Sequence, residues 1–190
     1  MSRVIHRNPF EKEVNFSEKE MVFIRKVSED RQAPKDANIE KVTDKRIIKR
    51  DNVETHMIGL LGEFAVAKLI HGDVDINSYL SGDSVKDFDI YGVSIEVKTL
   101  QGYLSFVRLS DFIADVAALV IYNKNNHSKV FVQGWISRHD FIECHFIDNF
   151  GYGDRPCIQP AELSPIETLR TYCVMTRNFR WLQTHANRTE

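Results

Sequence analysis

Apolar residues recur at every fourth position between residues 51 and 72, where the sequence reads DNVETHMIGLLGEFAVAKLIHG. This spacing predicts a helix with one core-facing stripe, made of Val53, Met57, Leu61, Ala65 and Leu69. The final residue, Gly72, stands where a glycine commonly ends a helix. Gly59 and Gly62 lie inside the helix, where each costs about 1 kcal/mol relative to alanine. We therefore expect another element to pack very closely against this helix.

An earlier helix is predicted over residues 18–31. Ser17 is followed three residues later by Glu20, which is the spacing of a capping box. Met21, Phe23, Ile24 and Val27 supply the apolar residues, and the stretch APKDAN is then expected to end the helix.

Alternation of apolar and polar residues predicts strands in the middle of the chain. The stretch DFDIYGVSIEVKT, residues 87–99, predicts two strands joined by a tight turn at Gly92. The segments VAALVIYN and KVFVQGWIS predict two further, buried strands. RHDFIECHF predicts a short helix, CIQPAEL a short strand or extended segment, and SPIETLRTY a last helix. This order predicts an α/β protein with a central mixed β-sheet flanked by α-helices.

Alternate residues of a strand share a face, so Val93, Ile95 and Val97 are expected in the core. Glu96 and Lys98 then lie on the opposite face, roughly 6–7 Å apart along the strand. In the preceding strand Asp87 and Asp89 share a face, and a tight hairpin is expected to bring Asp89 near Glu96. A cross-strand ion pair on a solvated surface would also explain this pattern, at a few tenths of a kcal/mol.

Glu63 adds a third carboxylate, on a helix face away from the apolar stripe and beside the glycines. Three acids that converge repel one another unless a cation neutralises them. Oxygen ligands of this kind select Mg²⁺, Mn²⁺ or Ca²⁺. A lysine beside such a cluster can hold a water molecule or stabilise negative charge on a phosphoryl oxygen.

The composition is that of a globular protein, most simply one domain: 190 residues, of which 43% are hydrophobic, with 9 Gly and 5 Pro. No apolar run approaches the ~20 residues of a membrane helix, and the N-terminus has no signal-peptide pattern, so we expect an intracellular, cytoplasmic protein. Cys144, Cys157 and Cys173 include no Cys-x-x-Cys pair and are expected to be free thiols rather than zinc ligands.

The net charge of −2 is unevenly distributed. Residues 1–50 sum to +4 and residues 51–190 to −6, and the positive excess is concentrated in KVTDKRIIKR, residues 41–50. A basic segment beside an acidic body suits a polyanion that binds next to metal-holding carboxylates. A solvated helix face is the alternative interpretation of the same residues.

The segments GLLGEFAVAKLI and DFDIYGVSIEVKT together resemble the PD-(D/E)XK nuclease superfamily. Many restriction enzymes, archaeal-type Holliday junction resolvases and phage nucleases have this fold. Asp89 matches the first acid of the family, Glu96 and Lys98 match its Glu-x-Lys, and Glu63 matches the glutamate that many members place on the preceding helix. The resemblance covers residues 56–99. Phe88 stands where the family pattern has proline, and Asp87 is the alternate candidate for the first acid.

The resemblance implies a restriction-endonuclease-like core and metal-dependent hydrolysis of DNA phosphodiester bonds. Asp89, Glu96 and the backbone carbonyl of Val97 would bind Mg²⁺ or Mn²⁺. Glu63 would bind a second ion or a metal-bound water, and Lys98 would orient the attacking water and stabilise the developing charge.

The expected partner is DNA, contacted through Lys45, Arg46, Lys49 and Arg50 before the glutamate helix, and through Gln101 and Arg108 after the lysine strand. A homodimer would cut both strands. The expected layout is a basic, helical N-terminal extension over residues 1–50, a nuclease core over residues 51–140 and a C-terminal extension packed on that core over residues 141–190. The alternatives are a nuclease-fold DNA-binding protein without activity, or a structural, partner-binding protein.

Overall fold

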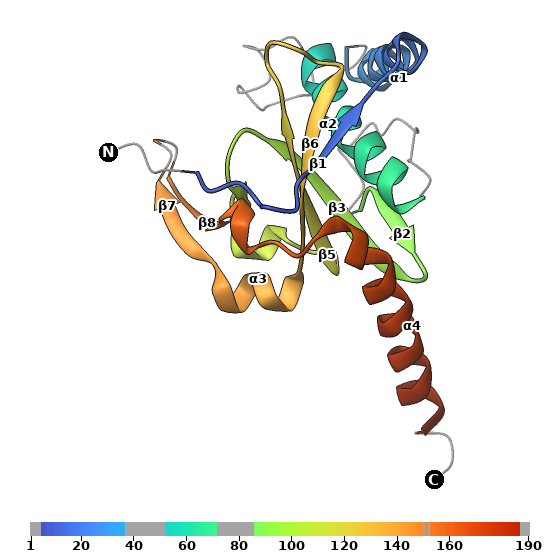
Figure 1. The fold of residues 1–190 in the computed structure, drawn as a ribbon, viewed down its shortest axis with the longest axis vertical. Helices are drawn as coiled ribbons and strands as arrows, with labels where there is room; N and C mark the ends of the chain where they lie inside the picture. Colours follow the sequence, from blue (N-terminus) through green and yellow to red (C-terminus); the bar gives the residue numbers. More distant parts are fainter. Residues whose placement is uncertain (1–4, 37–51, 72–85, 150, 152, 187–190) are drawn as a thin grey trace.

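The computed structural model describes residues 5–36, 52–71, 86–149, 151 and 153–186, and a five-stranded mixed sheet forms the centre of this part (Figure 1). In spatial order its strands are β1 (Lys12–Asn15), β6 (Lys129–Ser137), β5 (Val116–Tyr122), β3 (Val93–Leu100) and β2 (Phe88–Ile90). Strands β3 and β5 are parallel, and the other neighbours are antiparallel. The predicted α/β class and central mixed sheet are confirmed; β1 was not predicted.

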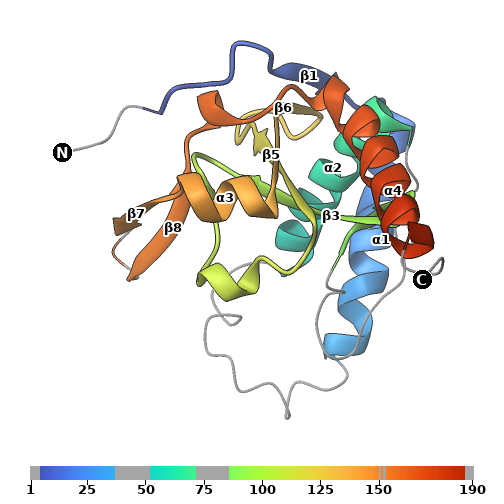
Figure 2. The ribbon, with the colours of Figure 1, turned by 90° about the horizontal axis from the view of Figure 1, so that it is seen from below.

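Helices α1 (Glu18–Asp36) and α2 (Asn52–Ile70) cover one face of this sheet, with α2 against the strands and α1 packed on α2 (Figure 2). The predicted stripe of α2 faces the core, where Met57, Leu61 and Ala65 are buried. Val93 and Ile95 of β3 are fully buried on the same side of the sheet, and Val97 packs partly buried beside them, as the strand alternation predicted.

The second face of the sheet carries a smaller, three-stranded antiparallel sheet and the short helix α3 (Arg138–Cys144) (Figure 2). The strands are β4 (Leu104–Ser105), β8 (Asp154–Ile158) and β7 (Phe146–Asn149), and the 3₁₀ turns η3 (Leu109–Asp111) and η4 (Pro160–Glu162) lie in the same part of the chain. Strand β5 is buried on both faces, with alternate residues in the two cores, because it lies between these layers.

Helix α1 begins with the predicted capping box. The Ser17 N–H donates to Glu20 Oε2 at 2.8 Å, and the Glu20 N–H donates to Ser17 Oγ at 3.4 Å. The predicted end near residue 31 is wrong, because the helix continues to Asp36.

The C-terminal part forms the 3₁₀ turn η5 (Ile166–Thr168) and helix α4 (Leu169–Ala186). This helix is much longer than the stretch SPIETLRTY predicted, and it projects away from the rest of the protein (Figure 1). Cys144 is exposed, Cys157 and Cys173 are buried, and all three are free thiols, as expected. None of the helices in the described ranges is long and apolar enough to cross a membrane.

Candidate active site

Helix α2 packs directly against β3 at Gly62. A Cβ atom at this position would lie 1.9 Å from Thr99 Oγ1 and 3.3 Å from Val97 Cγ1. Only glycine therefore allows the helix to pack at this distance. The close packing expected from the glycines is confirmed at Gly62, and it brings the next residue, Glu63, to the strand that carries Glu96 and Lys98.

The hairpin between β2 and β3 turns on two residues with positive φ, Tyr91 at 55° and Gly92 at 79°, which is typical of a type I′ turn. The tight turn at Gly92 is therefore confirmed. The register pairs Asp89 with Ser94, so Asp89 lies diagonally across from Glu96, which is two residues further along β3. The two-residue turn sets this register, and one consequence is that Asp87, whose N–H donates to Ile95 O at 2.9 Å, lies at the level of Glu96.

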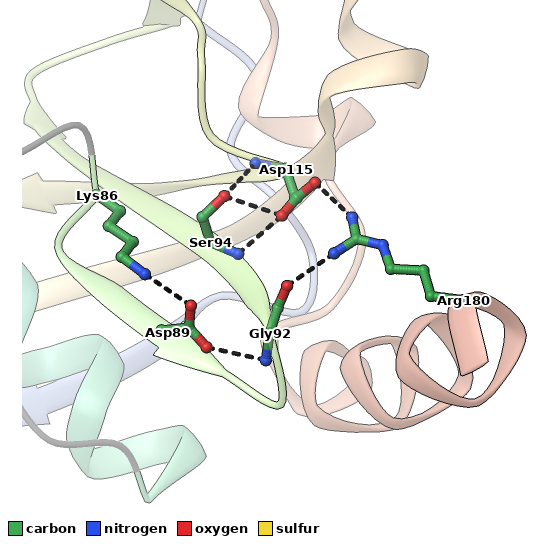
Figure 3. A network of polar contacts seen from close by, with 6 residues as sticks. All are labelled: Lys86, Asp89, Gly92, Ser94, Asp115 and Arg180. Carbon is green, nitrogen blue, oxygen red and sulfur yellow. Dashed lines mark hydrogen bonds and ion pairs between the residues drawn. The ribbon is translucent and has the colours of Figure 1, made fainter. Parts of the chain in front are cut away.

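Asp89 is exposed and lies near the turn of the hairpin, where Figure 3 shows it between Lys86 and Gly92. Its carboxylate accepts hydrogen bonds from Lys86 Nζ at 2.7 Å and from the Gly92 N–H at 2.8 Å. The Lys86 ammonium holds the pKa of Asp89 below its usual value. These contacts describe a solvated ion pair that also closes the turn.

Asp87 has a very different environment. It is half-buried, and its Oδ2 accepts a hydrogen bond from the Val97 N–H at 2.6 Å. Burial raises the pKa of Asp87 to about 7, and the negative charges of Glu63 and Glu96 add to this increase. The Val97 hydrogen bond and the Lys98 charge lower it, without cancelling the increase. The structure thus brings Asp87 together with Glu63, Glu96 and Lys98.

Glu63 is buried, with 7% of its surface exposed, and forms a two-pronged ion pair with Arg31 of α1. The two guanidinium nitrogens of Arg31 lie 3.4 Å and 3.3 Å from the two carboxylate oxygens. Sequence reasoning missed Arg31. A signal was present, because Arg31 follows the buried residues Ile24 and Ser28 on the same helix face, where a charged side chain requires a partner.

Glu96 and Lys98 point to the same side of β3 and form an ion pair. Their side chains are 17% and 33% exposed, so solvent reaches both. The Lys98 ammonium also lies 5.2 Å from the centroid of the Phe106 ring, which belongs to the second core. This cation–π contact holds the lysine against the apolar surface of the second core.

The predicted DNA-contacting residues have less structural context. Gln101 is exposed just beyond the end of β3, and Arg108 is exposed before η3, with its N–H donating to Asp111. Lys45, Arg46, Lys49 and Arg50 lie outside the described residues. Contact of these residues with nucleic acid remains a prediction.

The chemistry of the donors suits a divalent cation, because Asp87, Glu63 and Glu96 are carboxylates and lie near enough for the charges of the two glutamates to raise the pKa of Asp87. Two of these carboxylates already form ion pairs with basic side chains of the protein: Glu63 with Arg31, and Glu96 with Lys98. Within the described part of the chain, no three His, Cys, Asp or Glu side chains are grouped so that they could hold a metal ion. A metal ion would therefore compete with Arg31 and Lys98 for the carboxylates.

Comparisons with known proteins found no match to this chain among family models, curated proteins or solved structures. What the site can do therefore follows from its own residues: a poorly compensated carboxylate, two further acids and a half-buried lysine around one strand.

Proposed function

We propose that this protein is a divalent-metal-dependent DNA endonuclease with a site of the PD-(D/E)XK type. The observation that carries the proposal is the half-buried position of Asp87, whose Oδ2 accepts a hydrogen bond from the Val97 N–H at 2.6 Å, between Glu96 and Lys98. The charges of Glu63 and Glu96 contribute to the raised pKa of this carboxyl, about 7, after burial. The arrangement of β2 and β3 as a hairpin, with β5 parallel to β3 and α2 packed across them, supports a restriction-endonuclease-like core.

In this proposal Asp87 takes the role of the first acid in place of Asp89. Asp87, Glu96 and the backbone carbonyl of Val97 would hold Mg²⁺ or Mn²⁺, with Glu63 binding a second ion or a metal-bound water. When bound, the cation lowers the pKa of a water molecule and neutralises charge on the scissile phosphate. Asp89 is less suited because it is exposed and both of its carboxylate oxygens accept hydrogen bonds at the turn, from Lys86 and from the Gly92 N–H.

Lys98 serves as the residue that positions the attacking water and donates a hydrogen bond to a phosphate oxygen as charge develops there. Its side chain is partly exposed, so a substrate can reach it, and its ammonium lies against the Phe106 ring. Its ion pair with Glu96 suits a role in charge stabilisation.

The site requires a DNA-binding surface around it, for which the basic residues Lys45, Arg46, Lys49 and Arg50 are the candidates, together with Gln101 and Arg108. Their contacts would go to phosphates, so binding would weaken steeply with salt and carry little sequence information. Cleavage of both strands would follow from two copies of the site in a homodimer.

The test is incubation of the full chain with supercoiled plasmid in Mg²⁺, beside a control in EDTA. We expect nicking or linearisation in Mg²⁺ alone. Lys98→Ala and Asp87→Asn should abolish it, whereas Asp89→Asn, the matched change two residues away, should keep it. Full cleavage by both Lys98→Ala and Asp87→Asn would remove this assignment of the site.

One observation favours a second candidate, a nuclease-fold protein that binds DNA without cleaving it. Arg31 and Lys98 already neutralise Glu63 and Glu96, so two of the acids are satisfied without metal. Such a protein would retard DNA in a gel-shift experiment in Ca²⁺ and leave plasmid intact in Mg²⁺ and in Mn²⁺.

A further inference from the structure

Arg31 reaches the candidate site from α1, the outer of the two helices on this face of the sheet (Figure 2). Its two terminal guanidinium nitrogens lie 3.4 Å and 3.3 Å from the two carboxylate oxygens of Glu63, one nitrogen to each oxygen. A metal ion that used Glu63 would need one or both of these oxygens. The ion pair therefore occupies the atoms that the proposed metal site requires.

The two side chains of this pair are enclosed by the protein, with 14% of Arg31 and 10% of Glu63 exposed. Their contacts are longer than the roughly 2.7–2.9 Å of the strongest bonds between charged donors and carboxylates. The pair thus compensates two charges that are largely removed from water, through bonds that are not the tightest available. This combination suits a contact that a more highly charged cation can replace.

Helix packing, and not the ion pair itself, sets where Arg31 lies. Ile24 and Ser28 are buried in the two turns of α1 that precede Arg31. The Phe23 ring of α1 also meets the Phe64 ring of α2 edge-on, at 5.8 Å between centroids. Residues three, four and seven apart share one side of a helix, so α1 directs Arg31 toward α2.

Lys98, which pairs with Glu96 in the same site, is placed differently. Its side chain is 33% exposed, more than twice the exposed fraction of Arg31. Solvent already reaches this lysine, so it can turn away from Glu96 at little cost when another cation approaches. Arg31 has to leave a more enclosed position, and competition between a protein cation and a metal ion is therefore strongest at Glu63.

Gly59, one turn before Glu63, leaves room beside the same carboxylate. A Cβ atom at this position would lie 4.0 Å from Glu63 Oε1, which is an ordinary contact distance, and the residue is half-buried although it has no side chain. Close packing among the described residues does not require a glycine here, unlike at Gly62. The room beside Oε1 gives a small ion access to Glu63 once the guanidinium withdraws.

We propose that Arg31 is a positioning residue that sets the metal affinity of Glu63, because its guanidinium occupies both carboxylate oxygens and has to withdraw before a divalent ion binds there. The inference rests on the proposed metal-dependent function and assigns to it a residue outside the Asp, Glu-x-Lys and helix-glutamate pattern. It also links metal binding to the contact between α1 and α2, since the same ion pair joins these two helices.

Binding of Mn²⁺ to the full chain, measured by electron paramagnetic resonance of the free ion, tests the proposal without relying on cleavage. We expect Arg31→Gln to bind Mn²⁺ about tenfold more tightly than the wild type, the factor lost by a site that is open roughly one-tenth of the time. Arg31→Lys should lie between them, because an ammonium cannot contact both oxygens as a planar fork does. Lys68→Gln is the matched control: Lys68 also joins α2 to α1, through Glu20 at 2.7 Å, and its loss should leave the affinity unchanged.

Equal Mn²⁺ affinity in the wild type and both Arg31 variants, with matching circular dichroism, overturns the proposal and makes the pair a structural tie between α1 and α2. If Arg31→Gln fails to fold, because the Glu63 charge is left unpaired, Arg31→Lys decides alone, and an affinity equal to that of the wild type overturns the proposal.

Plasmid cleavage separates this inference from the proposed function. Equal affinities together with cleavage by the wild type would remove the inference and leave the nuclease assignment standing. Tighter binding by Arg31→Gln without cleavage by any variant would support the inference and remove the nuclease assignment. Absence of Mn²⁺ binding in the wild type and in both Arg31 variants overturns the two together.

Discussion

The carboxylate of Asp87 accepts a hydrogen bond from the backbone N–H of Val97 at 2.6 Å. Asp87 immediately precedes β2, and Val97 lies in β3 between Glu96 and Lys98. This contact therefore holds a half-buried acid against the strand that carries the other two charged residues. Asp89, two residues later, is exposed and paired with Lys86. The two aspartates have opposite pKa shifts, which makes them a natural pair for experiments.

The first prediction concerns stability and pH in the absence of metal. The pKa of Asp87 is raised from 3.8 to about 7, so between these values the folded state binds more protons than the unfolded state. Asp87 therefore contributes fully to the free energy of unfolding below about pH 4. This contribution decreases as the pH rises and is lost above about pH 7. Asp87→Asn removes this pH dependence of stability, because an amide does not titrate. The variant should be more stable than the wild type at pH 8 by on the order of 2 kcal/mol, allowing for solvent screening of a half-buried group.

Urea unfolding in EDTA at pH 5 and pH 8, with wild type and variant compared at each pH, measures this difference. Asp89→Asn is the control: Lys86 lowers the pKa of Asp89, so that carboxylate stabilises the protein above about pH 4 and its removal should cost a little at pH 8. Equal behaviour of the two variants would contradict the environment described for Asp87.

A second prediction concerns metal binding. Mn²⁺ should raise the melting temperature of the wild type, because an ion that binds only the folded state stabilises it. The increase should disappear in Asp87→Asn and in Glu96→Gln, and persist in Asp89→Asn. Thermal unfolding at increasing Mn²⁺ gives the result directly. If Asp89→Asn loses the increase and Asp87→Asn keeps it, the first acid of the site is Asp89.

The third prediction compares the two glycines of α2. A methyl group at Gly62 would lie 1.9 Å from Thr99 Oγ1, and Thr99 is β-branched and stiff, so Gly62→Ala should destabilise the protein by about 1–3 kcal/mol. At Gly59 the nearest atom, Glu63 Oε1, is 4.0 Å away. Gly59→Ala should therefore be neutral or stabilising by up to about 1 kcal/mol, the difference in helix propensity.

Denaturant midpoints of the two variants provide the comparison. Thr99→Ala in the Gly62→Ala background should recover part of the lost stability, since it removes the atom that clashes. Equal destabilisation at both positions would show that helix propensity, and not contact with β3, decides the effect.

The parts of the fold that local pattern encodes were predictable. Val93 and Ile95 are fully buried because a period-two pattern determines which face of a strand is apolar. The three short strands β1, β4 and β7, of 4, 2 and 4 residues, were not predicted, because so few residues carry no readable period and their pairing depends on distant segments.

The site was predictable only as far as its residues share one local segment. Glu96 and Lys98 followed from the alternation within β3. The choice between Asp87 and Asp89 did not follow, since both share a face; it depends on the register that the turn at Tyr91 and Gly92 imposes and on burial. Arg31 lies 32 residues from Glu63 in sequence, and nothing in a local pattern joins them.

The last prediction concerns how α4 is held to the hairpin. Burial raises the pKa of Asp115, but hydrogen bonds from the Ser94 N–H and hydroxyl, together with the ion pair to Arg180, lower it overall. Arg180→Ala breaks this pair and also the bond to the Gly92 carbonyl. Because the pair is partly exposed, we expect a modest loss of global stability, about 1 kcal/mol, but a clear local effect. Hydrogen exchange should quicken in the second half of α4 while β3 and β5 stay protected.

Arg170→Ala is the matched control. The contact of Arg170 with the Tyr91 hydroxyl is long, at 3.4 Å, and lies at the start of the helix, so this change should not alter exchange near Arg180. Unchanged exchange in Arg180→Ala would mean that the remaining contacts of α4, the buried Leu169 and Cys173 and the stacking of Arg177 on Tyr91, hold the helix without Arg180.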